Sequence, residues 1–300
     1  MAFQKLTLKD KALFERFLNA CRHELAVYNF ANIYVWKELF DIFWRVKQGH
    51  LCVFFKDRMG SFLYLPPLSL KPANPSVLRW AFAIMDGFNK NSRISRIENV
   101  EKEQVDFYRK LGYKITDKPG DYLYARQDLA QLRGNRFKSK RSSLNYFKEH
   151  YQYEYFAYFA AHKKACFKLY ADWMRSRQAA SHDPVYRGML QDCTGCLKLL
   201  LNNYSRLGVT GRLVEIAGEI KAFTFGYALN KQVFCILYEI TDLSIKGLAQ
   251  FIFWQFCAEL KNYRYINAMD DSGLENLKKV KLSYKPAKVV GNYIVTRGNA

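Results

Sequence analysis

The amino-acid sequence predicts an α/β protein, and three observations support this fold class. Runs of β-branched and aromatic residues of strand length alternate with amphipathic helical patterns along the chain. Half of the 300 residues are hydrophobic, which is enough to bury a sizeable core in one or two domains. The two halves also share a loose order of helix, meander, helix and strand, without a clean sequence repeat.

The first half is expected to begin with a helix over residues 8–25, because Leu13, Phe14 and Phe17 fall on one helical face. Pro66 follows a strand-like run and ends it, since proline cannot continue a hydrogen-bonded ladder. Gly112 is expected to stop a later helix, since glycine commonly follows the last helical residue. The expected elements after the first helix are strands 43–46, 51–56 and 62–65, helix 77–89, strand 96–100, helix 103–111 and strand 122–126.

The second half is expected to open with two long helices, because apolar residues from Cys166 onward and from Tyr186 onward repeat at helical spacing. A region of β-branched and aromatic runs with short polar turns follows, which is typical of a β-meander. A later helix, 246–260, is apolar nearly all round, so we expect it to be buried against the sheet. The strands of the meander are expected over residues 211–217, 220–229 and 232–240.

The stretch 265–286 combines a strand end, a polar turn and a short helix. Ser272 and Glu275 have capping-box spacing, so Ser272 is expected to cap the helix. At 100° per residue, Leu274, Leu277 and Val280 make the buried stripe, and Lys281 projects between Leu274 and Leu277. A lysine on an apolar face is either a stem that reaches solvent or a charge held in a pocket.

Asn267, Asp270 and Asp271 sit at the end of the preceding strand, where α/β sheets place their ligands. We therefore expect Asn267, Asp271 and Lys281 to converge on one site, with Tyr284 nearby. The competing interpretation is a capped helix with solvated lysines.

A basic block follows residue 132 and interleaves cations with small polar and aromatic side chains. Arginine forks and lysine charges with small hydrogen-bonding groups suit a phosphate backbone or a lipid phosphate. The alternative is a solvated linker, which is what most charge runs are. The candidate binding residues here are Arg133, Arg136, Lys138, Lys140, Arg141 and Asn145.

The net charge of +20 favours an anionic partner such as nucleic acid, anionic lipid or a phosphorylated substrate, although a merely basic protein is the alternative. The seven scattered cysteines suit a reducing cytoplasm. The CxxC of Cys193 and Cys196 lies beside an apolar stripe, so we expect packing and no metal site. No signal peptide is recognisable, and the apolar run 248–257 is too short to span a bilayer. We expect a soluble cytoplasmic protein that touches a membrane, if at all, from its surface.

Two blocks of residues resemble a known family. The first comprises Ile266-Asn267, Asp271, Gly273, Leu277, Lys281, Ser283-Tyr284 and Pro286; the second comprises Arg133-Gly134, Phe137, Lys140-Arg141, Asn145 and Phe147. Both are similar to signatures of the phosphatidylglycerol lysyltransferase C-terminal domain family, many of whose soluble members have no known function. The family is similar in fold to Fem-type aminoacyltransferases and GNAT acyltransferases. The resemblance implies two tandem GNAT-like domains, residues 1–130 and 131–300, each a mixed sheet flanked by helices, with the active site in the second.

The loop before helix 246–260 departs from the GNAT pattern. GNAT enzymes cradle the pyrophosphate of acyl-CoA there with Arg/Gln-x-x-Gly-x-Gly/Ala. This chain has Ser244 in place of the Arg or Gln, followed by Lys246, Gly247 and Ala249. This departure weakens the case for acyl-CoA as the donor. Lys246 and Gly247, at the N-terminus of a helix, remain a candidate anion site.

No Ser-His-Asp, HExxH, Walker or Rossmann fingerprint is present. That absence suits direct acyl transfer, in which an acceptor amine or hydroxyl attacks a bound activated ester. Lys281 would stabilise the oxyanion, and Asp271 would orient the acceptor, hold Lys281 or take a proton.

Three functions remain in competition. The first is aminoacyl transfer from charged tRNA, which the charge and the resemblance favour; the second is acyl-CoA-dependent N-acylation; the third is non-catalytic binding of nucleic acid or an anionic membrane. No bound cofactor is expected in any of them. The lipid-modifying enzymes of the family carry an integral-membrane half that we do not find here, so we do not assume their acceptor for this chain, and a lipid, a peptide and a small molecule all stay open. Oligomeric state is left open.

Overall fold

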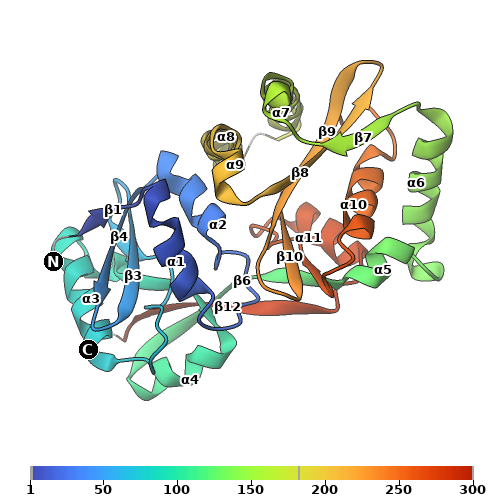
Figure 1. The fold of residues 1–300 in the computed structure, drawn as a ribbon. Helices are drawn as coiled ribbons and strands as arrows, with labels where there is room; N and C mark the ends of the chain where they lie inside the picture. The colour runs from blue at the N-terminus through green and yellow to red at the C-terminus, as the bar shows by residue number, and fades with distance from the viewer. Residues whose placement is uncertain (1–2, 182, 299–300) are drawn as a thin grey trace. The chain divides into compact units, whose positions relative to one another are not determined.

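The computed structural model describes residues 3–181 and 183–298 (Figure 1). The chain divides into two compact units. The first holds the residues up to Asp121, the segment Asp270–Gly273 and the residues from Val289 onward, and the second holds Tyr122–Met269 and Leu274–Lys288. The boundary expected near residue 130 lies inside the second unit by this division.

The first unit carries strands in the order β1-β2-β3-β4-β5-β12. Neighbouring strands are antiparallel except β4 and β5, which are parallel. Its elements are β1 (Gln4–Lys5), η1 (Leu8–Asp10), α1 (Lys11–Leu18), α2 (Phe30–Val35), η2 (Trp36–Glu38), β2 (Asp41–Lys47), β3 (His50–Lys56), β4 (Ser61–Leu63), α3 (Pro75–Phe88), η3 (Ser92–Ile94), β5 (Arg96–Glu101), α4 (Lys102–Lys110) and β12 (Lys288–Arg297).

The helix expected over residues 8–25 was wrong in length, since α1 ends at Leu18. The chain beyond it is held by the carboxylate of Glu101. This carboxylate accepts hydrogen bonds from the backbone N–H groups of Glu24 (3.0 Å) and Leu25 (3.4 Å), and lies 2.7 Å from Nδ1 of His23. Hydrogen bonds to a distant side chain therefore satisfy backbone N–H groups that would have been bonded within a longer helix.

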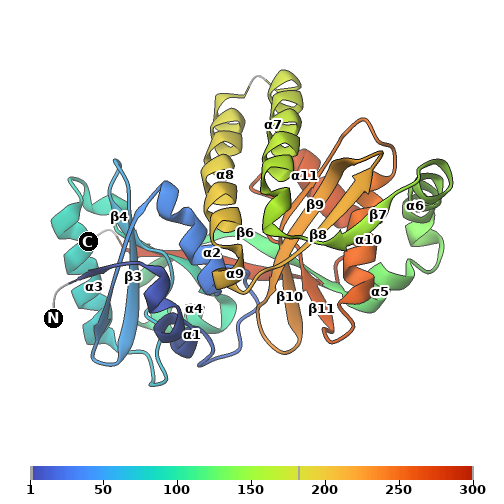
Figure 2. The ribbon, with the colours of Figure 1, turned by 45° about the horizontal axis from the view of Figure 1, so that its top comes forward.

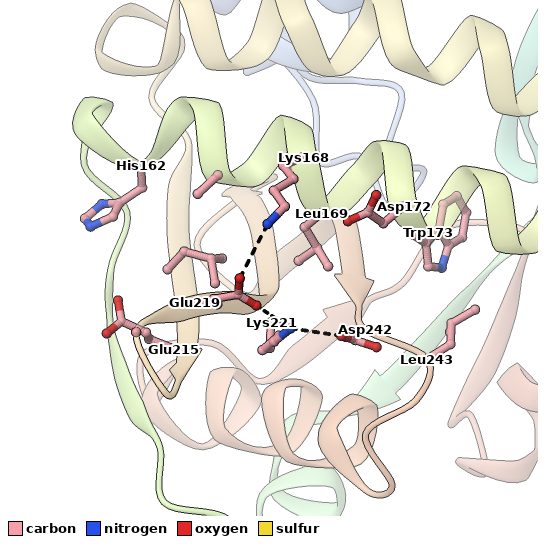
Figure 3. A pocket seen from close by; sticks show the side chains of 13 residues that line it. His162, Lys168, Leu169, Asp172, Trp173, Glu215, Glu219, Lys221, Asp242 and Leu243 are labelled. Carbon is pink, nitrogen blue, oxygen red and sulfur yellow. Dashed lines mark hydrogen bonds and ion pairs between the residues drawn. The ribbon is translucent and has the colours of Figure 1, made fainter.

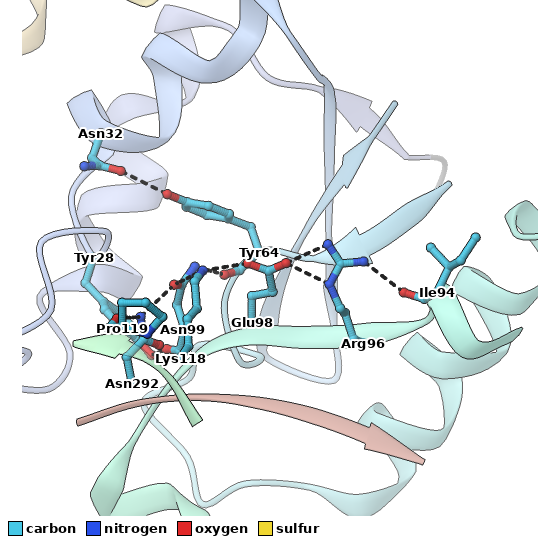
Figure 4. A network of polar contacts seen from close by, with 10 residues as sticks. All are labelled: Tyr28, Asn32, Tyr64, Ile94, Arg96, Glu98, Asn99, Lys118, Pro119 and Asn292. Atoms are coloured by element: carbon cyan, nitrogen blue, oxygen red, sulfur yellow. Dashed lines mark hydrogen bonds and ion pairs between the residues drawn. The ribbon is translucent and has the colours of Figure 1, made fainter. Parts of the chain in front are cut away.

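A polar network surrounds Asn99, which sits in β5 with a left-handed φ of 55° (Figure 4). Its carbonyl accepts from the Tyr28 hydroxyl at 2.7 Å, and its amide donates to the Tyr64 carbonyl at 2.9 Å. Lys118 donates to both Glu98 (2.7 Å) and Asn99 Oδ1 (3.0 Å). Burial acts to raise the pKa of Glu98, but the charges of Lys118 and a neighbouring arginine hold it below its ordinary value. This network stabilises the strand end.

The second unit carries strands in the order β6-β11-β10-β9-β8-β7, of which only the neighbours β10 and β11 are parallel in the part of the unit that is described. Its elements are β6 (Tyr113–Ala125, which begins in the first unit), α5 (Arg126–Gln131), η4 (Asn135–Phe137), α6 (Lys138–His150), β7 (Glu154–Ala157), η5 (Ala160–His162), α7 (Lys163–Ala179), α8 (Pro184–Asn202), α9 (Tyr204–Leu207), β8 (Thr210–Ile216), β9 (Glu219–Ala228), β10 (Val233–Thr241), α10 (Leu248–Glu259), β11 (Tyr265–Asn267) and α11 (Glu275–Ser283).

The two units repeat one pattern along the chain. In each, antiparallel strands lead to a helix (α3 or α10), a strand parallel to the preceding one (β5 or β11) and a second helix (α4 or α11). The strand after α4 is β6, which pairs with β11, and the strand after α11 is β12, which pairs with β5. Each half of the chain thus supplies the closing strand of the other unit. The predicted fold class, mixed sheets flanked by helices in two repeated halves, is confirmed.

Helix α10 lies at the centre of the second unit. It packs on β9 and β10 with one side and on α5 and α6 with another. The ring of Phe251 lies tilted against that of Phe147 of α6 at a centroid distance of 4.7 Å, and the ring of Phe256 contacts that of Phe234 of β10 edge-on at 5.5 Å. The prediction that this nearly all-apolar helix is buried against the sheet is confirmed. On the other face of the strands, α7 and α8 run side by side (Figure 2).

Candidate functional site

The turn before α11 differs from the predicted capping box. Ser272 does not cap the helix, which begins at Glu275. The carboxylate of Asp270 accepts from the Ser272 N–H at 2.9 Å, and that of Asp271 accepts from the Gly273 N–H at 3.0 Å. Ser272 and Gly273 have left-handed φ values of 52° and 70°. Two consecutive side-chain-to-backbone turns therefore delay the helix, because these short acidic side chains compete for the amides.

Asn267 lies at the end of β11 and is fully buried. Its side-chain oxygen accepts from the Met269 N–H at 2.7 Å, so Asn267 shapes the turn that leaves the sheet. Asp271 is also buried, but it belongs with the first unit whereas Asn267 and Lys281 belong to the second. Its convergence with Lys281 stays a prediction.

Lys281 is half-buried on α11, while Lys279 on the same helix is exposed. The Lys281 ammonium donates to the carbonyl of Ala268 and lies 5.8 Å from the centre of the Tyr122 ring. The apolar stripe was predicted to include Val280, and this was wrong, since Val280 is 53% exposed. The structure therefore holds Lys281 inward by polar contacts.

Tyr284, just after α11, joins three elements. Its ring lies 4.8 Å from that of Phe253 on α10, and the ammonium of Lys140 on α6 lies over it at 4.1 Å. Burial lowers the pKa of Lys140, because a partly desolvated ammonium is less stable in its charged form. Burial, and then the charge of Glu239, raise the pKa of Tyr284. Lys140, predicted as a binding residue, is thus placed beside Tyr284.

Glu239 on β10 was missed by the sequence analysis. Its carboxylate oxygen Oε2 is out of contact with solvent and has no hydrogen-bond partner among residues 3–181 and 183–298. Burial raises the pKa of Glu239 to about 8, even though the charge of Lys281 acts to lower it. Burial, followed by the charge of Glu239, raises the pKa values of Tyr284 and Cys257. Glu239 therefore shares one neighbourhood with α10 and the end of α11.

A β-bulge places Glu239 on this face. The pairing of β10 with β9 shifts between Ile236 and Tyr238, which inserts Leu237 as an extra residue. Ile236 belongs to the core beneath α10, and strict alternation would put Tyr238 on the same side. Instead the Tyr238 hydroxyl donates to the Cys193 carbonyl of α8 at 3.1 Å, on the opposite face. Two adjacent polar residues in an apolar strand were the sole sequence signal for this bulge.

The other residues of the basic block divide into exposed and structural side chains. Arg133 and Asn145 are exposed, and Arg136 pairs with Asp128 at 2.9 Å on the surface. Arg141 instead donates to the carbonyls of Leu132 and Gly134, so it stabilises the loop between α5 and α6.

Gly247 and Lys246 lie at the start of α10. Gly247 has φ +85°, and a Cβ there would lie 2.1 Å from the carbonyl oxygen of Ser143 on α6. The glycine is therefore required by close packing of α6 against α10. Lys246 places its ammonium over the Tyr146 ring of α6 at 4.1 Å.

A cavity of about 400 Å³ lies elsewhere in the second unit, between α7 and the β8–β9 hairpin (Figure 3). Lys221 pairs with Glu219 at 2.7 Å and with Asp242 at 3.3 Å, and Lys168 reaches Glu219 at 3.4 Å. His162 and Trp173 lie toward opposite ends of the lining. The cavity contains none of the predicted site residues, and its ion pairs account for most of its charge.

The CxxC cysteines lie in the packing of α8. Cys196 is buried, and burial raises the pKa of Cys193 to about 11, which disfavours the thiolate that metal binding or redox chemistry needs. No group of metal-ligating side chains occurs in the part of the chain that the structure describes. Nor does any described helix have the length and apolar character that crossing a bilayer requires.

The family model described as "Phosphatidylglycerol lysyltransferase, C-terminal" matches residues 20–296. The chain belongs to this family. The resemblance carried by the two residue blocks is thereby confirmed. No curated protein matches the sequence.

Solved structures share the fold over nearly the whole chain. A conserved protein of unknown function from Bacteroides thetaiotaomicron is 27% identical, with 99% of this chain and 100% of that chain covered and a TM-score of 0.88. L-PGS from Bacillus licheniformis is 16% identical, with 97% and 93% covered and a TM-score of 0.66. A tandem GNAT protein from the clavulanic acid biosynthesis pathway is 9% identical, with 100% and 99% covered and a TM-score of 0.51. The tandem GNAT protein therefore shares the fold of this chain, in agreement with the predicted fold class.

Proposed function

We propose that this protein transfers an aminoacyl group from charged tRNA to an amine or hydroxyl acceptor, at a site in the second unit built around Lys281. The observation that carries this proposal is the inward-facing ammonium of Lys281, supported by the Ala268 carbonyl and the Tyr122 ring and accompanied by a buried carboxyl at Glu239. A fixed positive charge of this kind suits an oxyanion.

In the proposed reaction the acceptor nitrogen or oxygen attacks the ester carbonyl of the donor. The carbonyl oxygen becomes an oxyanion, and the Lys281 ammonium stabilises it as charge develops. The intermediate then collapses, the bond to the tRNA ribose oxygen breaks, and the proton lost by the acceptor ends on that oxygen. No covalent enzyme intermediate is needed. Asp271 and Asn267 remain candidates for orienting the acceptor or taking its proton.

Charge and local packing support tRNA over acyl-CoA as donor. The +20 net charge suits a long polyanion, and Arg133, Arg136 and Lys138 are exposed around the start of α6. In the loop before α10, Ser244 replaces the Arg or Gln of the GNAT pattern, and Gly247 is used for packing against Ser143. Both features weaken the acyl-CoA alternative.

The experiment is a transfer assay with total tRNA charged with labelled amino acids. Purified protein is mixed with charged tRNA and with lipid vesicles or soluble amines, and label is followed from tRNA into acceptor. Label that moves faster than spontaneous ester hydrolysis supports the proposal. Transfer from acyl-CoA but not from charged tRNA would identify acyl-CoA as the donor instead. Mass spectrometry of copurified RNA and small molecules provides an independent check. Polyanion binding without transfer from any donor would favour the non-catalytic alternative.

A further inference from the structure

Glu239 is the one described carboxyl in the second unit that combines a raised pKa with an oxygen lacking any hydrogen-bond partner among residues 3–181 and 183–298. A buried carboxyl oxygen without a hydrogen-bond partner is costly, and a catalytic or binding role is one reason for a native protein to retain one. The bulge at Leu237, which turns Glu239 toward α10 and α11, is a feature that strands use to re-aim a side chain beside a site.

The elements around Glu239 leave its charge incompletely balanced. Helix α10 presents the Cys257 thiol, and the segment after α11 presents the Tyr284 hydroxyl; the charge of Glu239 raises the pKa of each, so neither is a counter-ion. Lys281 is the cation on α11, but its ammonium donates to the Ala268 carbonyl. The burial of Glu239 outweighs the effect of Lys281.

We propose that Glu239 binds the ammonium group of the aminoacyl moiety that the enzyme transfers, beside the Lys281 ammonium that faces the ester carbonyl. This inference rests on the proposed function, and it assigns to Glu239 the selection of an aminoacyl ester as the substrate. An aminoacyl ester carries a cation next to the reacting carbonyl, whereas an ordinary acyl thioester does not. A carboxylate for the ammonium and a lysine for the carbonyl oxygen are the complementary pair that such a substrate requires.

Proton linkage provides a readout that does not depend on activity. With a pKa of about 8, Glu239 is almost fully protonated at pH 6.5 in the free protein. Binding an ammonium favours the carboxylate, so about one proton is released for each ligand bound. A ligand without the positive charge releases none through Glu239.

The test uses amino-acid amides as mimics of the donor and their N-acetylated forms as uncharged partners. Isothermal titration at pH 6.5 in two buffers of different ionisation enthalpy counts the protons released. We expect wild type to bind at least one of the twenty amides with release of about one proton, and to bind its N-acetyl form at least tenfold more weakly. The substitution E239Q should abolish the proton release and lower the affinity for the charged amide at least tenfold. Glu149, exposed on α6, provides the matched control, and E149Q should behave as wild type.

Each other outcome overturns a distinct claim. The ammonium subsite is wrong if no amide binds, or if E239Q lowers the affinities for charged and N-acetylated amides equally. Glu239 would then act through Lys281 or through packing. If aminoacyl transfer occurs and E239Q leaves its rate unchanged, the proposed function stands without this subsite. If amides bind with Glu239-dependent proton release but no donor supports transfer, the subsite stands and the proposed function falls.

Discussion

The hydroxyl of Tyr124, near the end of β6, donates a 2.9 Å hydrogen bond to the backbone carbonyl of Lys281 on α11. The same carbonyl accepts from the Tyr284 backbone N–H at 3.1 Å where the helix ends, and the additional donor from β6 ties that helix end to the sheet. Burial raises the pKa of Tyr124, which keeps its hydroxyl protonated and able to donate. A strand that begins in the first unit thus positions the residue proposed to stabilise the oxyanion.

Replacing Tyr124 with Phe should loosen this helix end. Loss of one neutral hydrogen bond is expected to cost about 1 kcal/mol of unfolding free energy. Transfer should fall by several-fold, because the helix end that carries Lys281 would be less firmly positioned. Denaturant unfolding and transfer rates measure the two effects. An unchanged transfer rate with the expected loss of stability would show that the hydrogen bond serves the fold alone.

Removing the carboxyl at Glu239 should stabilise the protein as the pH rises. The pKa of Glu239 is raised from 4.5 to about 8, so between these values the folded state holds a proton that the unfolded state has lost. The unfolding free energy of wild type therefore falls with increasing pH over this window, whereas that of E239Q lacks this loss. At 1.36 kcal/mol for each pKa unit, the difference at pH 8 is at most about 5 kcal/mol in favour of E239Q. Parallel stability curves from pH 4.5 to 8 would contradict this.

The alternation of strands and helices and the burial of α10 follow from periodicity, so both were predictable. The exchange of closing strands between the two halves was not predictable. The residues 288–297 carry no local signal that β12 pairs with β5, which is distant in the sequence. The start of α11 was mispredicted because Asp270 and Asp271 compete for the amides that the capping box needed.

Site residues divide in the same way. Projection on a helical wheel found Lys281, and the resemblance drew attention to Lys140 and Tyr284. Glu239 was out of reach, because its side-chain direction depends on the bulge at Leu237, and a one-residue shift moves a side chain to the opposite face.

The start of α10 should not tolerate a side chain at position 247. Gly247→Ala would place a methyl group 2.1 Å from the Ser143 carbonyl oxygen at a φ of +85°, so we expect a loss of roughly 2–4 kcal/mol. Gly188→Ala on α8 meets no atom within 4 Å and should be neutral or slightly stabilising. Thermal melts of the pair test this. Equal melting temperatures would show that α6 can move away from α10, leaving Gly247 free for another role.

The exposed cations around the start of α6 should bind tRNA electrostatically. The logarithm of the affinity should fall linearly with the logarithm of salt concentration, and Arg133→Ala with Lys138→Ala should reduce the slope by about two while leaving stability unchanged. Arg141→Ala should instead lower stability, because its guanidinium holds the carbonyls of Leu132 and Gly134. Filter binding of tRNA over a salt series provides the slope. A slope that neither exposed substitution changes would place the tRNA elsewhere.

The most direct test compares two lysines on one helix. Lys281 is half-buried and donates to the Ala268 carbonyl, whereas Lys279, two residues earlier on α11, is exposed. Transfer rates and melting temperatures of Lys281→Ala and Lys279→Ala are measured against wild type with the same donor and acceptor. We predict that Lys281→Ala lowers the transfer rate by roughly two to three orders of magnitude with a nearly unchanged melting temperature, while Lys279→Ala matches wild type. A Lys281→Ala variant that melts lower but transfers at the wild-type rate would contradict the catalytic assignment.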